Sequence, residues 1–170
     1  VLSGASFNPN GKSIYNPIEI AGTGAAGSSG ALWSQPSNVL VSAIYGNLTL
    51  MADNTRLGSS YTSVGSGSVL SIYGDINSLA GNSYGFSTAG TESVKLYGGK
   101  SITGNVSIGN GLTFQLLTNG ANATFSNNFS VASGSKLHVV PTSTYSVIIN
   151  GSVSGAGNAS LDAGSNVIAD

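Results

Sequence analysis

The chain has 170 residues, of which only 6% are charged, against about 25% in a typical globular domain, and its formal net charge is −1. Hydrophobic residues make up 40% and are spread along the chain, which excludes the disordered class that combines low hydrophobicity with high net charge. The five Lys and Arg residues form no cluster of the kind that binds nucleic acid, and no long apolar run predicts membrane insertion by this segment. Because the chain has no Cys, disulfides and thiolate chemistry are excluded as well.

Short apolar runs with a period of two follow one another along the chain, and each is bounded by Gly, Asn, Ser or Pro. No window keeps apolar residues at a helical period between clear helix caps. The sequence therefore predicts an all-β protein with many tight turns. The runs that predict strands are, in chain order, 18–20, 39–41, 48–50, 69–72, 94–96, 106–108, 112–116, 129–131, 137–139 and 145–149.

Short strands of this kind fit either an antiparallel sandwich or a solenoid, and an internal repeat favours the solenoid. An apolar-Tyr-Gly triplet occurs at 44–46, 72–74 and 96–98, so its glycines recur at similar intervals. A longer pattern, apolar-x-apolar-x-Gly-x-apolar, occurs at 70–76 and again at 147–153. A repeat of roughly 20–30 residues with several short strands is typical of one turn of a β-solenoid. With about 24 residues per turn, residues 1–170 are predicted to form a single solenoid segment of roughly seven turns.

Stacked turns place like residues on like residues. We expect Ile72 and Ile76 in an internal apolar column, and Gly74 at a corner where φ is positive. Identical charges would repel at every turn, whereas Asn, Ser and Thr can form hydrogen-bonded ladders, which accounts for the low charge.

Several of these segments resemble a known family. Residues 70–76 and 147–155 resemble the Leu-Thr-Leu-Ser-Gly-x-Ile-Ser-Gly theme of autotransporter-associated β-strand repeats, and 14–24 with 30–32 resembles the Asn-Pro-Ile … Gly-Thr-Gly … Gly-Ala-Leu block of such arrays. The chain differs in its irregular spacing and in having Tyr where the family has Ser or Thr before Gly. The resemblance implies a right-handed parallel β-helix in the secreted or surface-exposed passenger of a large bacterial protein. It carries over no catalytic residue.

The triplets also predict a candidate site. If the apolar residue of each triplet points inward, alternation points Tyr45, Tyr73 and Tyr97 outward, and stacked turns would place them in one column. Such a column stabilises the face of a sheet, which is the interpretation we favour. It would alternatively offer a flat, uncharged ligand or partner surface to a glycan or another protein.

Residues for catalysis are scarce. Polysaccharide-degrading enzymes need clustered acids, often beside Arg or Lys. Asp53 and Asp75 are separated in sequence by close to one predicted turn, and Arg56 lies near Asp53. We nevertheless favour solvated or turn-capping roles for these acids. The single His, His138, is expected to face outward without partners for a triad or a metal site. No cofactor and no metal site are predicted.

The sequence thus predicts a non-enzymatic, structural or adhesive extracellular solenoid that forms a rigid stalk, passenger or fibre segment on the outer envelope of a bacterium, as part of a longer repeat protein. The alternative is a polysaccharide-binding or polysaccharide-degrading protein. A cluster of Asp53, Asp75 and Arg56 in a groove would favour the degrading enzyme, and dispersal of these residues would exclude it. Expected partners are further copies of the chain, end to end or laterally, because open turns present unpaired backbone groups. A glycan or the surface of a host or neighbouring cell is the other expected partner.

Overall fold

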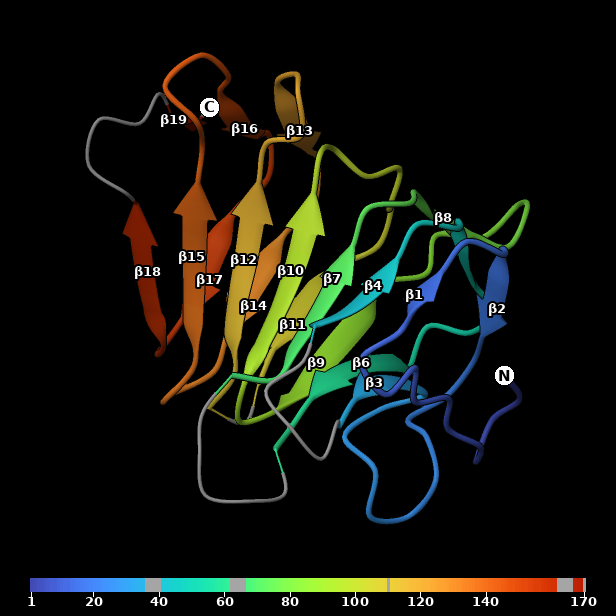
Figure 1. Cartoon of the computed structure of the whole chain (residues 1–170). Helices are drawn as coiled ribbons and strands as arrows, with labels where there is room; N and C mark the ends of the chain where they lie inside the picture. The colour runs from blue at the N-terminus through green and yellow to red at the C-terminus, as the bar shows by residue number, and fades with distance from the viewer. Residues whose placement is uncertain (36–40, 62–66, 110, 162–166, 170) are drawn as a thin grey trace.

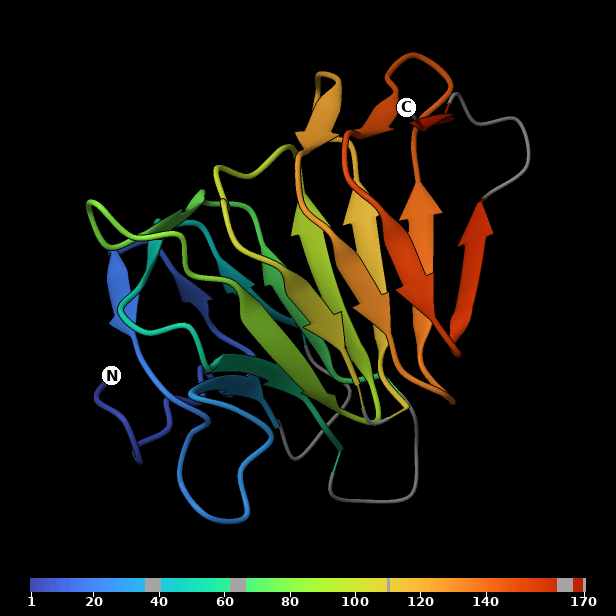
Figure 2. The ribbon, with the colours of Figure 1, turned by 180° about the vertical axis from the view of Figure 1, so that it is seen from behind.

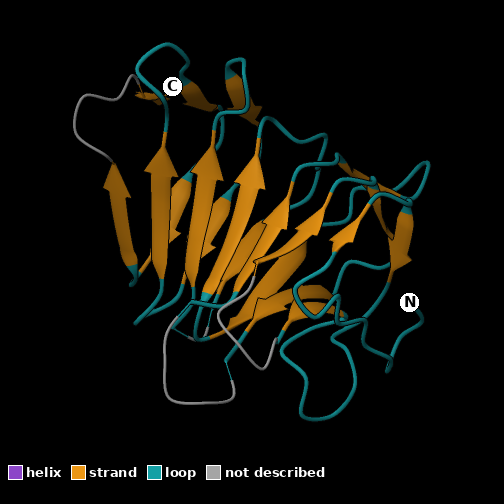
Figure 3. Cartoon of the chain, in the orientation of Figure 1, coloured by secondary structure: helices purple, strands orange, loops and turns teal. Residues whose placement is uncertain are grey.

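The structure is a computed structural model, and it describes residues 1–35, 41–61, 67–109, 111–161 and 167–169. Within these ranges the chain forms short strands and no helix (Figures 1 and 3). The strands are β1 (Ser13–Ile14), β2 (Ile18–Ile20), β3 (Leu32–Ser34), β4 (Val41–Ile44), β5 (Leu48–Leu50), β6 (Thr55–Ser59), β7 (Val69–Ile72), β8 (Ile76–Ser78), β9 (Phe86–Gly90), β10 (Ser93–Tyr97), β11 (Val106–Ile108), β12 (Thr113–Leu117), β13 (Ala123–Phe125), β14 (Phe129–Val131), β15 (Lys136–Val140), β16 (Val147–Ile149), β17 (Val153–Gly155), β18 (Asn158–Leu161) and β19 (Val167–Ala169).

The strands form four parallel sheets. The largest has seven strands in the order β1-β4-β7-β10-β12-β15-β18, and a second has six in the order β17-β14-β11-β9-β6-β3. The two large sheets form two faces of the solenoid. Two three-stranded sheets, β2-β5-β8 and β13-β16-β19, form its third face. Figures 1 and 2 show the two large sheets on opposite sides of the molecule, with successive turns side by side. The chain is a parallel β-solenoid, as the sequence predicts.

The number of turns is lower than predicted. Among the described strands, five turns contain a strand from each of three faces, the turn of β10 and β11 contains two strands, and β18 with β19 begins another. The solenoid thus makes about five complete turns, and the expectation of roughly seven was slightly too high. The count is lower because the turn of β10 and β11 lacks a third strand and because the turn that begins with β18 is not complete within the described residues. The repeat length also varies: it is long where Ser13 pairs with Ala43 and much shorter where Ser93 pairs with Thr113. Averaged over the described strands of the large sheet, the repeat is nevertheless about 24 residues, close to the predicted length.

The third face of the solenoid is interrupted at this short turn. The sheet β2-β5-β8 ends one turn before the gap, and the sheet β13-β16-β19 begins one turn after it. Between them, residues 98–105 pass the third face without forming a strand. We call this segment the break.

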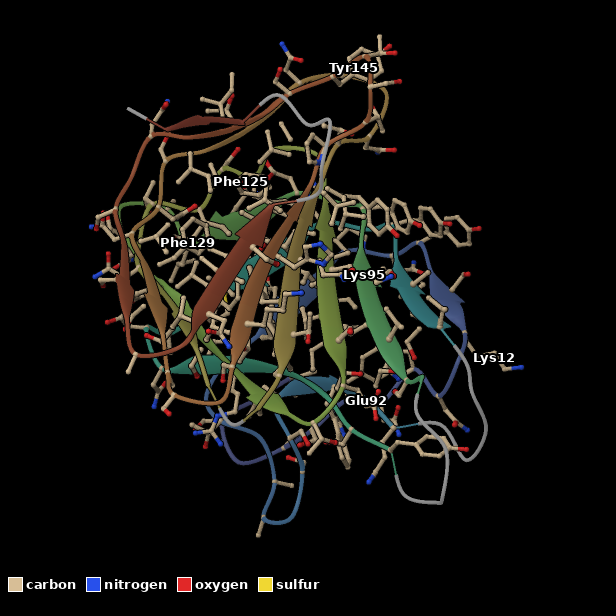
Figure 4. The ribbon with its side chains drawn as sticks, turned by 90° about the vertical axis from the view of Figure 1, so that its left-hand side faces the viewer. Lys12, Glu92, Lys95, Phe125, Phe129 and Tyr145 are labelled. Atoms are coloured by element: carbon tan, nitrogen blue, oxygen red, sulfur yellow. The ribbon has the colours of Figure 1, made fainter. Side chains whose placement is uncertain are left out.

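The core is a set of stacked apolar columns, as expected. One column consists of residues at the same position of successive strands of the large sheet: Ile44, Ile72, Leu96, Leu116 and Val139. Ile72 and Ile76 are both fully buried, which confirms their predicted inward direction. Phe125 and Phe129 lie inside the ring of strands, whereas Lys12 and Lys95 point away from it (Figure 4).

Several strands that sequence patterns missed have polar residues in inward positions. Ser34, Ser42, Ser59 and Ser68 are fully buried near the N-terminal half. The Ser34 and Ser42 hydroxyls are 2.8 Å apart, those of Ser59 and Ser68 are 3.2 Å apart, and the Ser68 hydroxyl donates to the Ser34 carbonyl at 3.1 Å. A buried hydroxyl is tolerated when it is hydrogen-bonded in this way. A pattern search counts these residues as exposed, and for that reason β3 and β6 escaped prediction. Residues 39–40 of the run predicted at 39–41 lie outside the described residues.

The glycine of the triplet has a different role from the one expected. Gly46 and Gly74 are not among the glycines with positive φ. Instead, a Cβ built at Gly74 would overlap the carbonyl oxygen of Gly46, so the corners of adjacent turns approach too closely for any side chain. Only the third member, Gly98, has a positive φ, of 78°. The break begins at this residue.

Charged residues on the strands pair with uncharged residues on the neighbouring turns, which avoids repulsion between stacked like charges. In the sheets, Glu19 pairs with Thr49, Arg56 pairs with Ser87, and Lys95 lies between Ser71 and Gln115. No like charges therefore stack between these neighbouring turns. Amides do form ladders at the corners: Asn128 Oδ1 accepts from the Ser152 N–H at 3.0 Å, and Asn128 Nδ2 donates to Asn105 Oδ1 at 3.3 Å.

Candidate functional site

Four tyrosines form an aromatic column on one corner of the solenoid. The rings of Tyr45 and Tyr73 have centroids 4.7 Å apart and an interplanar angle of 10°, and those of Tyr73 and Tyr97 are 4.3 Å and 14°. Tyr15 extends the column by one turn, stacking on Tyr45 at 4.9 Å and 7°. The spacing follows that of parallel strands, about 4.8 Å, so the sheet register sets the stacking distance. The predicted alignment of the three tyrosines on one face is confirmed.

Sequence reasoning missed Tyr15 because its triplet lacks the glycine. Residue 16 is Asn, so the search for apolar-Tyr-Gly passed over Ile14-Tyr15. The strand register would have found it, since Ile14 pairs with Ile44. At the other end the column continues with aliphatic residues, because Tyr97 pairs with Leu117 and Leu117 with Val140.

Stacking limits what the column can present to a ligand. Each interior ring uses both faces against its neighbours, so solvent meets ring edges and phenol hydroxyls. Tyr45 is 43% exposed, whereas Tyr15, at the end of the column, is 70% exposed and keeps one face open. A sugar that stacks on a ring face therefore has room only at Tyr15, while a partner of the whole column would meet a ridge of hydroxyl groups.

The column of rings ends beside a buried lysine in the break. Lys100 is only 8% exposed, and its Nζ donates to the carbonyl oxygen of Tyr97 at 2.7 Å and to that of Tyr73 at 3.2 Å. Burial lowers the pKa of Lys100 from 10.5 to about 8, an effect that the nearby Asp75 carboxylate partly offsets. Burial also raises the pKa of Tyr73 from 10.0 to about 12, with a further contribution from the Tyr97 phenol.

Asp75 and Asn127 supply further hydrogen bonds of the break. The Asp75 carboxylate accepts from the backbone N–H of Ile76 and of Ser101, both at 2.8 Å, and from the Ser101 hydroxyl at 2.7 Å. From the turn on the other side, buried Asn127 donates through Nδ2 to the carbonyl oxygens of Ile102, at 3.1 Å, and Gly104, at 2.8 Å. Side chains thus satisfy backbone groups that a strand would have paired.

Asp53 and Arg56 line a groove on the outer side of the six-stranded sheet. The groove has a volume of about 640 Å³. Its walls come from the turns that precede β6, β9 and β11 and from outward positions of these strands. The lining residues are Thr23, Asp53, Asn54, Arg56, Ser83, Phe86, Ser87, Thr103, Gly104, Asn105 and Ser107.

The structure does not bring Asp75 to this groove. The sequence spacing suggested that Asp53 and Asp75 lie on adjacent turns at the same position, but the local repeat is longer than that spacing, since Leu48 pairs with Ile76. Asp75 consequently stacks over Asn47, whose Oδ1 accepts from the Asp75 N–H at 3.0 Å. Asp53 instead accepts from the Gly85 N–H at 2.9 Å. The three residues of the alternative hypothesis are therefore dispersed, and only Asp53 and Arg56 share the groove.

His138 lies where alternation predicts, on the outer side of β15. Its Nδ1 is 3.2 Å from Gln115 Nε2, on the neighbouring strand. Among the residues that the structure describes, no three His, Cys, Asp or Glu side chains gather in a way that could hold a metal ion.

Within the same described residues, no helix is long and apolar enough to cross a membrane. Comparisons of the chain with protein-family models, with curated proteins and with solved structures gave no match.

Proposed function

We propose that the chain is a structural, non-enzymatic segment of a rigid extracellular rod. The observation that carries this proposal is the continuous seven-stranded parallel sheet, which runs through the solenoid from β1 to β18. Each turn hydrogen-bonds to the next, and each turn adds about 4.8 Å to the rod. Such a rod is rigid and keeps whatever is attached to its two ends at a constant distance. A stalk, a passenger or a fibre segment requires this property.

The sparsely charged surface supports an exposed location. Amide and hydroxyl ladders take the place of ion pairs at the corners, and the outer tyrosine column adds stacking between turns. Together with the resemblance of 70–76 and 147–155 to autotransporter-associated repeats, this supports a bacterial cell-surface passenger with an adhesive or presentational role.

Surface location is tested on intact cells of the organism that makes the protein. Antibodies against the chain should label intact cells in immunogold microscopy and should lose their target after brief external protease treatment. Labelling that requires permeabilised cells would refute the proposal.

End-to-end association is the partner interaction that we propose. The terminal strands of the large sheet, β1 and β18, each have a neighbour on one side only among the described strands. Near the two ends, Leu2 is 82% exposed and Val153 is 44% exposed. Light scattering over a range of concentrations should show growing rods, and electron microscopy should show filaments one solenoid wide. A monomer at all concentrations would contradict this part of the proposal.

A second candidate function is polysaccharide binding, and the groove of Asp53 and Arg56 is the observation that favours it. Hydrolysis by the usual mechanism uses two carboxylates that flank the scissile bond. In the groove only Asp53 provides a carboxylate among the described residues, because Asp75 accepts hydrogen bonds at the break. Binding is therefore the better-supported form of this candidate. A glycan array probed with the purified chain tests it, since the absence of any bound glycan would exclude it.

A further inference from the structure

We propose that the groove beside Arg56 binds a saccharide that bears a carboxylate, with the Arg56 guanidinium as the group that recognises it. This inference rests on the second candidate function, polysaccharide binding, and specifies its ligand. The groove volume of about 640 Å³ lies within the usual range of about 300–1,000 Å³ for small-ligand sites.

The guanidinium of Arg56 is available to a ligand. Arg56 is half-buried on β6 and lines the groove. Within the described part of the chain its side chain takes part in no hydrogen bond and no ion pair, and the same holds for the side chains of Ser87 and Ser107. A planar guanidinium binds a carboxylate through two parallel hydrogen bonds, a geometry that the ammonium group of Lys does not provide.

A row of hydroxyl groups leads away from Arg56 along the solenoid axis. Arg56 pairs with Ser87, Ser87 with Ser107, and Ser107 with Ser130, so one outward position of successive strands carries a guanidinium followed by three hydroxyls. The step between them is about 4.8 Å, which is close to the length of one pyranose unit in a β-1,4-linked chain. Side chains on the rim, Asn54, Thr103 and Asn105, add further donors and acceptors for sugar hydroxyls.

The charges in the groove favour a singly charged sugar unit over a phosphate polymer. Asp53 lies on the same groove as Arg56, and only one of its oxygens is engaged, by the Gly85 N–H. A carboxylate next to the cation would repel a polyanion with a charge at every phosphate, and no other Lys or Arg of the described chain lines the groove. For a uronate, Arg56 neutralises one carboxylate while Asp53 accepts from sugar hydroxyls.

The test compares two β-1,4-linked tetrasaccharides that differ in a single carboxylate. One is cellotetraose, and the other, the monouronate, has glucuronate in place of the non-reducing terminal glucose. Isothermal titration of the whole chain should show the monouronate binding at least about tenfold more tightly than cellotetraose. Arg56→Gln should remove this preference, and Arg56→Lys should restore only part of it. Ser107→Asp, which keeps Arg56 but adds a negative charge to the groove, should also weaken binding of the monouronate by about tenfold or more.

Lys95→Gln is the matched control, because it removes one positive charge from an outward position on β10 of the other large sheet. Its affinity for the monouronate should stay within about twofold of the parent chain, since the site is local. Circular dichroism and thermal unfolding confirm that each variant folds.

Three outcomes would overturn the inference. Equal affinity for the two tetrasaccharides would refute the role of the carboxylate while leaving glycan binding intact. An equal loss in Lys95→Gln and Arg56→Gln would show non-specific charge attraction. Binding of neither sugar would refute the inference together with the glycan-binding candidate, whereas the rod itself is tested separately by scattering and microscopy.

Discussion

The Nζ atom of Lys100 donates a hydrogen bond of 3.2 Å to the carbonyl oxygen of Tyr73, one turn away in the solenoid. This bond lies at the break, where the third face has no strand to pair with the turn of β8. The long Lys100 side chain, whose ammonium group has three N–H donors, therefore takes the place of backbone N–H donors that a strand would supply. The replacement is costly as long as the amine is charged, and this makes the stability of the solenoid sensitive to pH.

The free energy of unfolding is expected to rise with pH between about 8 and 10.5 because of Lys100, and to fall between about 10 and 12 because of Tyr73. In the first window the unfolded chain keeps the Lys100 proton, whereas in the folded chain burial lowers the pKa to about 8, so raising the pH favours folding. In the second window the folded chain keeps the Tyr73 proton, because its pKa is raised to about 12, while the unfolded phenol, at 10.0, loses it. Urea unfolding followed by circular dichroism at closely spaced pH values should show a maximum near pH 10.

Lys100→Met tests the origin of the rise above pH 8. Met keeps the length and apolar stem of the side chain but has no N–H donor, so the carbonyl oxygens of Tyr73 and Tyr97 lose these bonds. At pH 10, where most Lys100 side chains are neutral in the folded protein, we expect a loss of about 1–3 kcal/mol in the free energy of unfolding. The variant should also lack the increase in stability between pH 8 and 10. A variant that keeps this increase would show that another group titrates.

Tyr73→Leu is expected to destabilise the solenoid more than Tyr15→Leu. Tyr73 stacks on a ring on each side, whereas Tyr15 stacks on one. At about 0.5–1.5 kcal/mol per aromatic pair, the expected losses are about 1–3 and about 0.5–1.5 kcal/mol. Leu is suitable because Leu117 already occupies the equivalent outward position on β12. Tyr145→Leu, at a ring that belongs to no stack among the described residues, is the control and should change stability little. Equal effects of all three substitutions would contradict a stabilising role for the column.

Gly74→Ala should be far more harmful than Gly81→Ala. A methyl group at Gly74 would overlap the backbone of Gly46, which cannot move without separating two turns. We expect a loss of about 3 kcal/mol or more. Gly81 has a φ of 82° but nothing within 4 Å of its Cβ position, so Ala there costs only the left-handed backbone strain of about 1–2 kcal/mol. Thermal and urea unfolding of the two variants decide the question. A mild effect of Gly74→Ala would mean that adjacent corners are farther apart than the structure has them.

Asn127→Leu should destabilise the break from its other side. Leu is of similar size, but it cannot donate to the carbonyl oxygens of Ile102 and Gly104. One buried and one partly buried acceptor then lose their bonds, and we expect a loss of about 2–4 kcal/mol. Hydrogen exchange measured by mass spectrometry should show faster exchange around residues 98–105 than in β15. Uniformly faster exchange would instead indicate a general loss of stability.

The sequence by itself determined the class of fold and much of the aromatic column. Short runs with a period of two and a recurring triplet require stacked, short, parallel strands, because only stacking lets so small a unit bury its apolar face. Once the turns are stacked, alternation within 44–46, 72–74 and 96–98 fixes the outward direction of the tyrosines, since successive side chains of a strand point to opposite sides. These inferences depend on local periodicity alone.

The tertiary structure decided the register, and with it the sites. The repeat is long between β1 and β4 and short between β10 and β12. Each repeat length depends on the length of the loops that connect the strands of one turn. Loop length leaves little trace in hydrophobic periodicity. That is why the sequence spacing wrongly placed Asp75 beside Asp53, and why the break with Lys100 and Asn127 could not be foreseen. Which polar side chains share a groove and which replace a missing strand is determined only when the turns are stacked.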